Sequence, residues 1–223
     1  MSLAPKKHIV VIDPGVIRAE VYAFNRISQQ SSLPVTYHQP AMVGTESLGH
    51  EKPEEIAGLI ILGSLASVHD RLAWQPQLEN WLMPLLEKEI PTLGICYAHQ
   101  MIAHLFGGKV THHSEDKSNH KGLREVTLGA NPLWGANRSH HFYVSHCEHV
   151  AEKPACMNVI AQSAIIPVEG LVHQKLPIWT FQFHPEKIPG THGTENLPHE
   201  NFKAGHELVD KFLAYAHALV VKK

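Results

Sequence analysis

The chain has 223 residues, of which 43% are hydrophobic and 18% are charged, and its formal net charge is −2 with histidine neutral. This length suits one substantial α/β domain, and the small negative charge argues against a nucleic-acid-binding protein. No apolar run approaches the roughly 20 residues of a membrane-spanning helix, so we expect no membrane partner. The three cysteines lack C-x-x-C spacing, which argues against a disulfide framework and predicts a cytoplasmic protein.

The amino-terminal part of the chain alternates between strand-like and helix-like patterns. Helical spacing runs from about Val16 to Gln30 and again from Gln77 to Glu89. Strands that alternate with helices predict a parallel sheet covered by helices on both faces. The expected strands are His8–Asp13, Val35–His38 and Gly58–Leu62.

Cys96 lies where an apolar strand pattern turns directly into a helical pattern. Residues 90–95 are typical of the end of a buried parallel strand. Residues 97–106 are apolar at helical spacing and are followed by two glycines, which favour a helix end. A thiol at such a turn projects above the sheet edge, and the positive end of the helix dipole favours its thiolate form. We therefore predict that Cys96 is a nucleophile on an elbow.

A second segment supplies a base for this thiol. Residues 178–183 predict another strand, His184 follows at its end, and Pro185 terminates the strand. Glu186 lies two residues beyond His184, close enough to accept a hydrogen bond from one ring nitrogen and to steady the imidazolium. We predict a catalytic triad of Cys96, His184 and Glu186.

Between these two segments, the pattern changes to short strands joined by turns. We predict an antiparallel flap over residues 109–170 and a carboxy-terminal helix over residues 199–220, all within one domain spanning residues 1–223. The overall expectation is an α/β fold with an open, doubly wound, mostly parallel sheet flanked by helices and a small antiparallel extension. The expected short strands are 124–128, 141–145, 157–161 and 164–168.

Several segments resemble one known family. Residues 94–100 (GICYAHQ) resemble the nucleophile motif of class I, triad-type glutamine amidotransferases, and residues 181–186 (FQFHPE) resemble that family's second signature. Residues 145–150 (SHCEHV) and 106–110 (FGGKV) are similar to further segments of the family, in the same order. The likeness covers about residues 8–186 and is greatest to the glutaminase domain of GMP synthetase.

The resemblance implies a flavodoxin-like fold and a glutaminase without a cofactor. Cys96 would attack the side-chain amide of glutamine, release ammonia and form a γ-glutamyl thioester, which water converts to glutamate. Ammonia would pass to a separate synthetase subunit, because this chain has neither a P-loop nor a Ser-Gly-Gly phosphate loop.

The resemblance also implies roles for other residues. The backbone N–H groups of Ser64 and Tyr97 would form the oxyanion hole. Gln100 would hold the amino-acid end of glutamine. The residues implied to bind substrate are Gly63, Gln100, Ser145 and His146.

Three positions depart from the family pattern. Gly63-Ser64-Leu65 stands where the family usually reads Gly-Gly-Pro, and serine is less suited than glycine to a positive φ. Ala98 replaces the elbow glycine and places a methyl beside the nucleophile, where the substrate approaches closely. Glu148 replaces a common aspartate.

The 19 histidines show no H-E-x-x-H or cysteine-assisted spacing, so we predict that most of them lie on loops or the surface and that there is no metal site.

Two alternatives to the glutaminase remain open. A stand-alone hydrolase or peptidase for another γ-glutamyl compound would use the same triad without a partner. An inactive, decayed homologue would serve only in regulation or binding, although the complete triad makes this the third choice.

Overall fold

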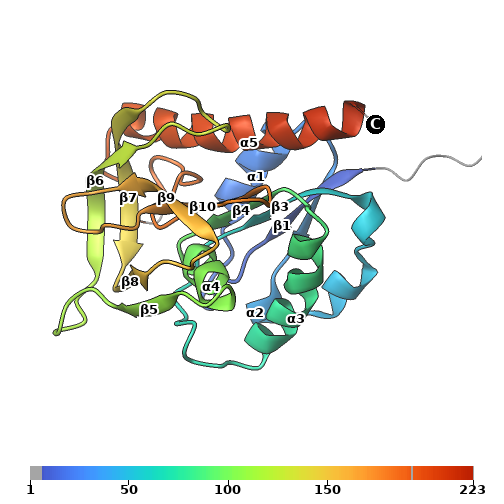
Figure 1. Cartoon of the computed structure of the whole chain (residues 1–223), viewed down its shortest axis with the longest axis horizontal. Helices are drawn as coiled ribbons and strands as arrows, with labels where there is room; N and C mark the ends of the chain where they lie inside the picture. Colours follow the sequence, from blue (N-terminus) through green and yellow to red (C-terminus); the bar gives the residue numbers. More distant parts are fainter. Residues whose placement is uncertain (1–6, 192, 223) are drawn as a thin grey trace, which may run out of the picture.

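A nine-stranded mixed sheet forms the centre of the protein in the computed structural model, which describes residues 7–191 and 193–222 (Figure 1). The strands are β1 (His8–Ile12), β2 (Val35–His38), β3 (Ile56–Ile61), β4 (Thr92–Ile95), β5 (Lys109–His112), β6 (His120–Leu128), β7 (Arg138–His146), β8 (Glu148–Glu152), β9 (Met157–Gln162), β10 (Gly170–His173) and β11 (Ile178–Phe181). The order in the sheet is β2-β1-β3-β4-β11-β10-β9-β6-β7, and β5 pairs with β8 in a separate two-stranded sheet. The first five strands in this order, from β2 through β11, run parallel to one another. The last four, β10, β9, β6 and β7, continue the sheet with antiparallel pairing.

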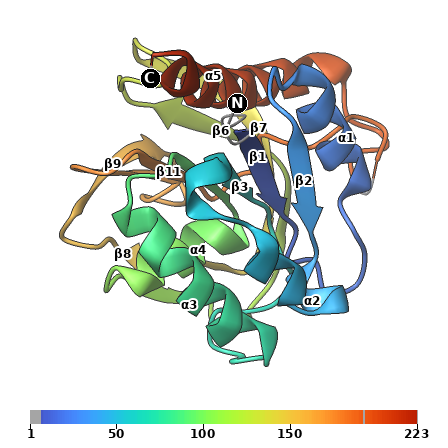
Figure 2. The same cartoon turned by 90° about the vertical axis from the view of Figure 1, so that its right-hand side faces the viewer.

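Helices cover both faces of the parallel part, as the sequence predicts. Helices α1 (Val21–Gln30) and α5 (Lys203–Val221) lie on one face, and α3 (Trp74–Glu87) and α4 (Tyr97–Leu105) lie on the other (Figures 1 and 2). The short helical segments are α2 (Pro40–Val43) and the 3₁₀ turns Glu46–His50, Pro53–Glu55 and His199–Phe202.

Two apolar cores result, one on each side of the sheet. In β1, Ile9 and Val11 pack into the core under α1 and α5, whereas Val10 and Ile12 pack into the core with α3 and α4. Burial on both faces explains why this strand is an unbroken apolar run.

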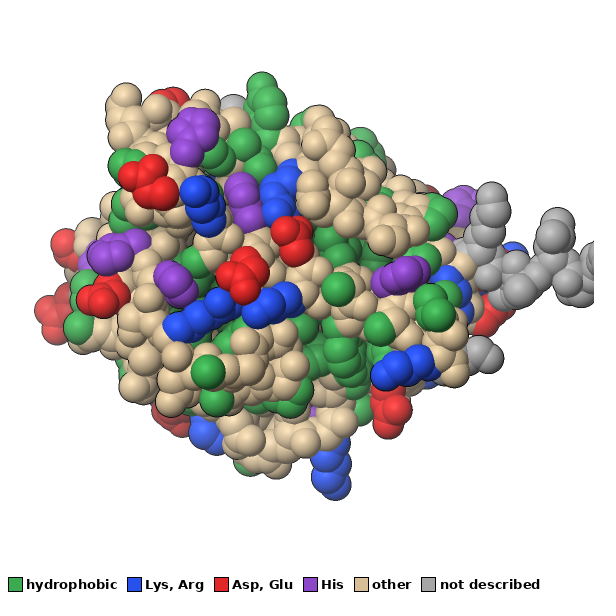
Figure 3. Space-filling model, turned by 90° about the horizontal axis from the view of Figure 1, so that it is seen from above, with side chains coloured by type: hydrophobic (Ala, Val, Ile, Leu, Met, Phe, Trp, Pro, Cys, Tyr) green, Lys and Arg blue, Asp and Glu red, His purple; other side chains and the backbone are tan. Residues whose placement is uncertain are grey.

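The first half of α5 carries charged side chains on its outer surface. Figure 3 views the molecule from this side and shows basic and acidic side chains next to one another. Lys211 pairs with Glu207 at 2.9 Å, and Arg26 of α1 pairs with Asp210 at 2.9 Å. In the described residues, no helix has both the length and the hydropathy of a membrane span.

The first helix begins later than the sequence predicts. Residues 16–20 do not join α1, because the Asp13 carboxylate accepts the N–H groups of Gly15 at 3.0 Å and Glu20 at 2.7 Å. These bonds hold the segment between β1 and α1 as a loop beside the carboxyl edge of the sheet.

The antiparallel region also differs from the prediction in two respects. Strands β6, β7, β9 and β10 extend the central sheet, so only the β5–β8 pair stands apart from it. The strand expected over residues 164–168 is wrong, since a turn occupies this segment and β10 begins at Gly170. The Ser163 hydroxyl accepts the Ile166 N–H at 3.0 Å, and Pro167 has no N–H for a ladder.

The carboxyl ends of β1, β3, β4 and β11 meet at one edge because these four strands are parallel neighbours. The loop after β1, the loop after β3, Cys96 and His184 all lie at this edge. In open α/β sheets this is where ligands bind.

Candidate active site

Cys96 has an unusual backbone conformation. Its φ of 52° and ψ of −102° lie where a residue with a Cβ is strained by about 1–3 kcal/mol. Two backbone hydrogen bonds hold Cys96 in this conformation. The Cys96 N–H donates to the Phe181 carbonyl at 2.7 Å, and the Cys96 carbonyl accepts the Gln100 N–H at 3.1 Å. The thiol is thus fixed between β4 and the start of α4.

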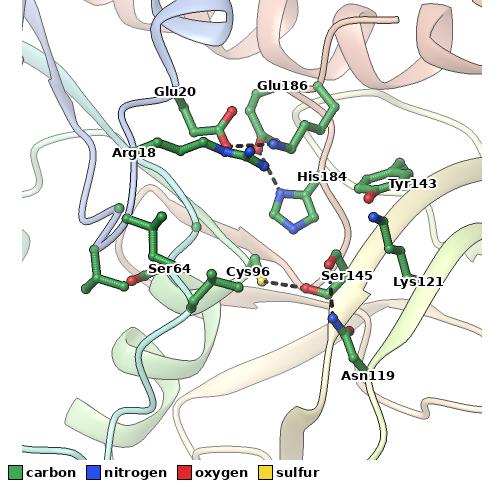
Figure 4. Close-up of a pocket in the computed structure, with 16 residues that line it drawn as sticks. Arg18, Glu20, Ser64, Cys96, Asn119, Lys121, Tyr143, Ser145, His184 and Glu186 are labelled. Atoms are coloured by element: carbon green, nitrogen blue, oxygen red, sulfur yellow. Dashed lines mark hydrogen bonds and ion pairs between the residues drawn. The ribbon is translucent and has the colours of Figure 1, made fainter. Parts of the chain in front are cut away.

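The structure brings His184 and Glu186 to this thiol. His184 Nδ1 lies 2.8 Å from Glu186 Oε1, and the His184 N–H donates to the Tyr143 carbonyl at 2.8 Å. The His184 ring lies between Cys96 and Glu186 (Figure 4), and all three side chains are buried. With Nδ1 engaged by the carboxylate, Nε2 is the ring nitrogen that remains for the sulfur.

Electrostatics at this trio favour an ion pair. Burial alone would lower the pKa of His184, but Glu186 and Cys96 outweigh it and raise the pKa to about 10. Burial would likewise raise the pKa of Glu186, yet the neighbouring imidazolium holds it below its usual range. Geometry and charge together suit a nucleophile with an oriented base.

Gly63 occupies the tightest point of the site. A Cβ at this position would lie 2.9 Å from His184 Cε1 and 3.2 Å from Cys96 Cβ, so only glycine lets the loop after β3 approach both side chains. The next residue, Ser64, lines the space in front of the thiol, and its hydroxyl accepts the Ala66 N–H at 3.1 Å.

A buried chain of amides supports the thiol from behind. Gln182 Nε2 lies 3.7 Å from Cys96 Sγ. Gln100 Nε2 donates to Gln182 Oε1 at 3.1 Å and to the Glu148 carbonyl at 2.8 Å. Gln100 therefore keeps only its carbonyl oxygen for a ligand. Gln182 was missed by sequence reasoning, although its place in the FQFHPE segment next to the base was a usable signal.

The flap contributes Ser145 and His146. The Ser145 carbonyl oxygen lies 3.9 Å from Cys96 Sγ. His146 uses both ring nitrogens internally, with Nδ1 2.9 Å from the Glu148 carbonyl and Nε2 3.0 Å from Arg124 Nη1. Burial and then Arg124 lower the pKa of His146 to about 3. His146 is thus a neutral support and offers no ring N–H to a ligand.

Arg124 is a second residue that sequence reasoning missed. Its guanidinium donates to Glu169 Oε1 at 2.9 Å, and both side chains are buried. The pair links β6 to the residue before β10 and holds His146 behind Ser145. A solvated residue on a short strand has the same sequence pattern, so no local signal marks it.

Two clefts meet at the sulfur. The His184 cleft has a volume of about 320 Å³ and extends from Cys96 and His184 to the loop after β1. The Gln100 cleft extends from Cys96 in the other direction, over Gln100 to Glu148 and the loop after β3. His184 lines only the first of these, whereas Gln100 and His146 line only the second. The two groups joined by a scissile bond can therefore lie in different clefts, with the bond itself at the sulfur.

Comparison with known proteins decides the family. The family model described as glutamine amidotransferase class-I matches residues 22–204. The chain belongs to this family.

Curated relatives agree with that assignment. One of the subunits of the glutamine-hydrolysing GMP synthase of Pyrococcus abyssi is 37% identical over 112 residues, which are 50% of this chain and 58% of that relative. The glutamine-hydrolysing GMP synthase of Wolinella succinogenes is 31% identical over 165 residues, which are 72% of this chain and 30% of the relative. The chain thus matches less than two thirds of either relative.

The fold is also that of amidotransferases of known structure. The crystal structure of a glutamine amidotransferase from Thermotoga maritima superposes with a TM-score of 0.68 at 17% identity, covering 95% of this chain and 96% of the other. A glutamine amidotransferase from Methylobacillus flagellatus gives 0.71 at 15% identity, covering 96% and 94%. These likenesses show the shared mixed α/β fold.

The structure explains how this amidotransferase-family chain tolerates its departures from the family pattern. Neither Gly63 nor Ser64, both in the described part of the chain, has a positive φ. A serine at position 64 therefore causes no backbone strain. Ala98 is fully buried in the core shared with α3 and α4, and its methyl lines neither cleft. The expectation that this methyl stands where substrate approaches is therefore wrong.

Glu148 lies in the Gln100 cleft. Its Oε1 accepts the Ser67 hydroxyl at 3.0 Å and lies 3.9 Å from His112 Nε2. The side chain is held by the loop after β3 and by the end of β5, which leaves Oε2 as an acceptor at the far end of the cleft.

Histidines gather on the flap near this cleft. The rings of His113 and His120 have centroids 3.7 Å apart, and His120 Nδ1 lies 3.0 Å from Arg124 Nη2. Throughout residues 7–191 and 193–222, no three His, Cys, Asp or Glu side chains form a group that could hold a metal ion.

Proposed function

We propose that this chain hydrolyses the side-chain amide of glutamine through a thioester on Cys96. The observation that carries the proposal is the contiguous series of Cys96, His184 and Glu186 at the point where the two clefts meet. Membership of the class I glutamine amidotransferase family supports the same reaction.

The first half of the reaction is acylation. The Cys96 thiolate attacks the amide carbon of glutamine, and the negative oxygen that develops is stabilised by the backbone N–H groups of Tyr97 and Ser64. His184 gives its Nε2 proton to the departing nitrogen, and the C–N bond breaks to release ammonia. Glu186 keeps the ring oriented and stabilises its protonated form.

The second half is hydrolysis of the γ-glutamyl thioester. His184, now neutral, takes a proton from water, which attacks the thioester carbon. Glutamate leaves, and the Cys96 thiolate and the His184 imidazolium are restored. Each group thus returns to its starting protonation state.

The Gln100 cleft suits the amino-acid end of glutamine. The Gln100 carbonyl oxygen and the Glu148 carboxylate are acceptors for its ammonium group. Gly63 and the backbone of Ser145 form the walls next to the sulfur, and His146 holds the Ser145 wall in position.

We further propose that the ammonia serves a separate synthetase subunit. The Pyrococcus abyssi relative is named as one of the subunits of a GMP synthase. The mouth of the His184 cleft also exposes Ile17 and Leu65 by 72% and 69%, and these side chains would give the synthetase subunit two apolar contacts there.

Mass spectrometry of the intact protein mixed with glutamine tests the proposal. We expect a γ-glutamyl adduct on Cys96 and release of glutamate, and Cys96→Ala should remove both while its circular dichroism spectrum stays that of the wild type. His184→Ala should slow acylation by at least about a hundredfold. Appreciable glutamate release by Cys96→Ala would refute the assignment of the nucleophile.

A further inference from the structure

The His184 cleft is much larger than the departing group of glutamine. Ammonia is about the size of a water molecule, which occupies about 30 Å³ in the liquid, whereas the His184 cleft has a volume of about 320 Å³. This volume lies within the usual range for small-molecule pockets.

Reaction geometry assigns the His184 cleft to the leaving group. The general acid must lie within hydrogen-bond reach of the departing nitrogen, and His184 lines only this cleft. The carbon chain of the acyl group then extends from the attacked carbon into the Gln100 cleft. Anything attached to the amide nitrogen therefore enters the space between the loop after β1 and the flap.

The charges of the His184 cleft are unbalanced. Its lining holds three basic side chains and two acidic ones, besides His184. Both carboxylates are engaged, because Glu20 pairs with Lys187 at 2.8 Å and Glu186 with His184 at 2.8 Å. Among the described residues, Arg18 and Lys121 make no ion pair with a carboxylate and are left as an excess of two positive charges.

These two cations come from opposite walls of the cleft. Arg18 belongs to the loop that Asp13 holds in place after β1, and Lys121 belongs to β6. In Figure 4, Arg18 lies on the side of Glu20 and Lys121 on the side of Tyr143, with His184 between them. An anionic group on the leaving amine would thus meet a cation on either wall.

We propose that this chain also hydrolyses γ-glutamyl amino acids, whose departing amino acid occupies the His184 cleft with its carboxylate between Arg18 and Lys121. This activity rests on the proposed function, since it uses the same thiol and base. Cys96 Sγ bonds to the γ-carbonyl carbon, the C–N bond breaks, and the amine nitrogen takes the proton from His184. Water then cleaves the thioester as before, so the products are glutamate and a free amino acid.

Three substrates and a set of variants test the proposal. The kcat/KM for glutamate release is measured with glutamine, γ-glutamylglycine and γ-glutamylglycinamide, the last two being similar in size and differing in the charge of the leaving group. We expect γ-glutamylglycine to exceed γ-glutamylglycinamide by at least about tenfold, which is about 1.4 kcal/mol. The preference should appear chiefly in KM.

The variants separate recognition of the charge from general damage. Arg18→Gln and Lys121→Gln should each reduce the preference for γ-glutamylglycine about threefold or more, and the double variant should abolish it. Lys175→Gln, at an exposed lysine between β10 and β11, is the matched control and should keep the wild-type preference.

The outcomes distinguish this proposal from the glutaminase itself. Turnover of glutamine without turnover of γ-glutamylglycine would overturn the proposal and leave the glutaminase standing. Equal rates for the two γ-glutamyl substrates, or a preference that the double variant retains, would also overturn it. If no substrate acylates Cys96, both proposals fall.

Discussion

Replacement of Glu186 by glutamine removes a charge while keeping the shape of the side chain. The glutamine carbonyl oxygen can still accept the His184 Nδ1–H, which now lies 2.8 Å from the carboxylate. A carboxylate at this distance shifts the pKa of its neighbour by about 1–3 units. The substitution should therefore lower the pKa of His184 from about 10. It should destabilise the protonated ring, relative to the neutral ring, by about 1–4 kcal/mol.

The assay is the pH dependence of kcat/KM for glutamine from about pH 6 to about pH 11, because its alkaline limb reports loss of the essential acid. We expect the alkaline limb of Glu186→Gln to move to lower pH by about 1–3 units. Turnover near neutral pH should fall less than in His184→Ala, since Glu186 only orients and charges the base. An unchanged alkaline limb, or a loss as severe as that of His184→Ala, would refute the reasoning.

The same variant has a consequence for stability. A histidine whose folded-state pKa is raised stabilises the fold fully below its ordinary pKa of 6.5, and this contribution is lost as pH rises through about 10. The difference in unfolding free energy between wild type and Glu186→Gln should therefore shrink from about pH 7 towards about pH 10. Glu207→Gln on α5, which removes an exposed carboxylate, should show no such trend.

Two further substitutions probe the loop after β3 and the support of the flap. Gly63→Ala should reduce turnover at least about tenfold, because the new Cβ would lie 2.9 Å from His184 Cε1. The control is Gly49→Ala, whose new Cβ meets no atom within 4 Å and which should keep the wild-type turnover. Equal activity of the two variants would count against a close approach of the loop to His184. Arg124→Met should lower the free energy of unfolding in urea by about 3–5 kcal/mol, because it leaves the buried Glu169 carboxylate without its cation. Adding Glu169→Leu should restore most of this loss. A double variant as unstable as Arg124→Met would show that the broken ion pair is not the cause.

The sequence by itself determined the parallel half of the fold and the residues at the reacting sulfur. β1 and β4, the nucleophile turn at Cys96 and the helix α4 follow from local patterns, because apolar runs, glycine stops and proline act within a few residues. His184 and Glu186 are likewise close in the chain, so their hydrogen bond could be foreseen.

Only the tertiary structure decided what surrounds these residues. Gln100 and Gln182 are 82 positions apart and meet because β11 lies beside β4. Arg124 and Glu169 meet 45 positions apart through the antiparallel strands, and Asp13 turns the expected start of the first helix into a wall of the His184 cleft. Such contacts depend on which strands become neighbours, and the energy of a buried polar pair carries no local signature in the chain.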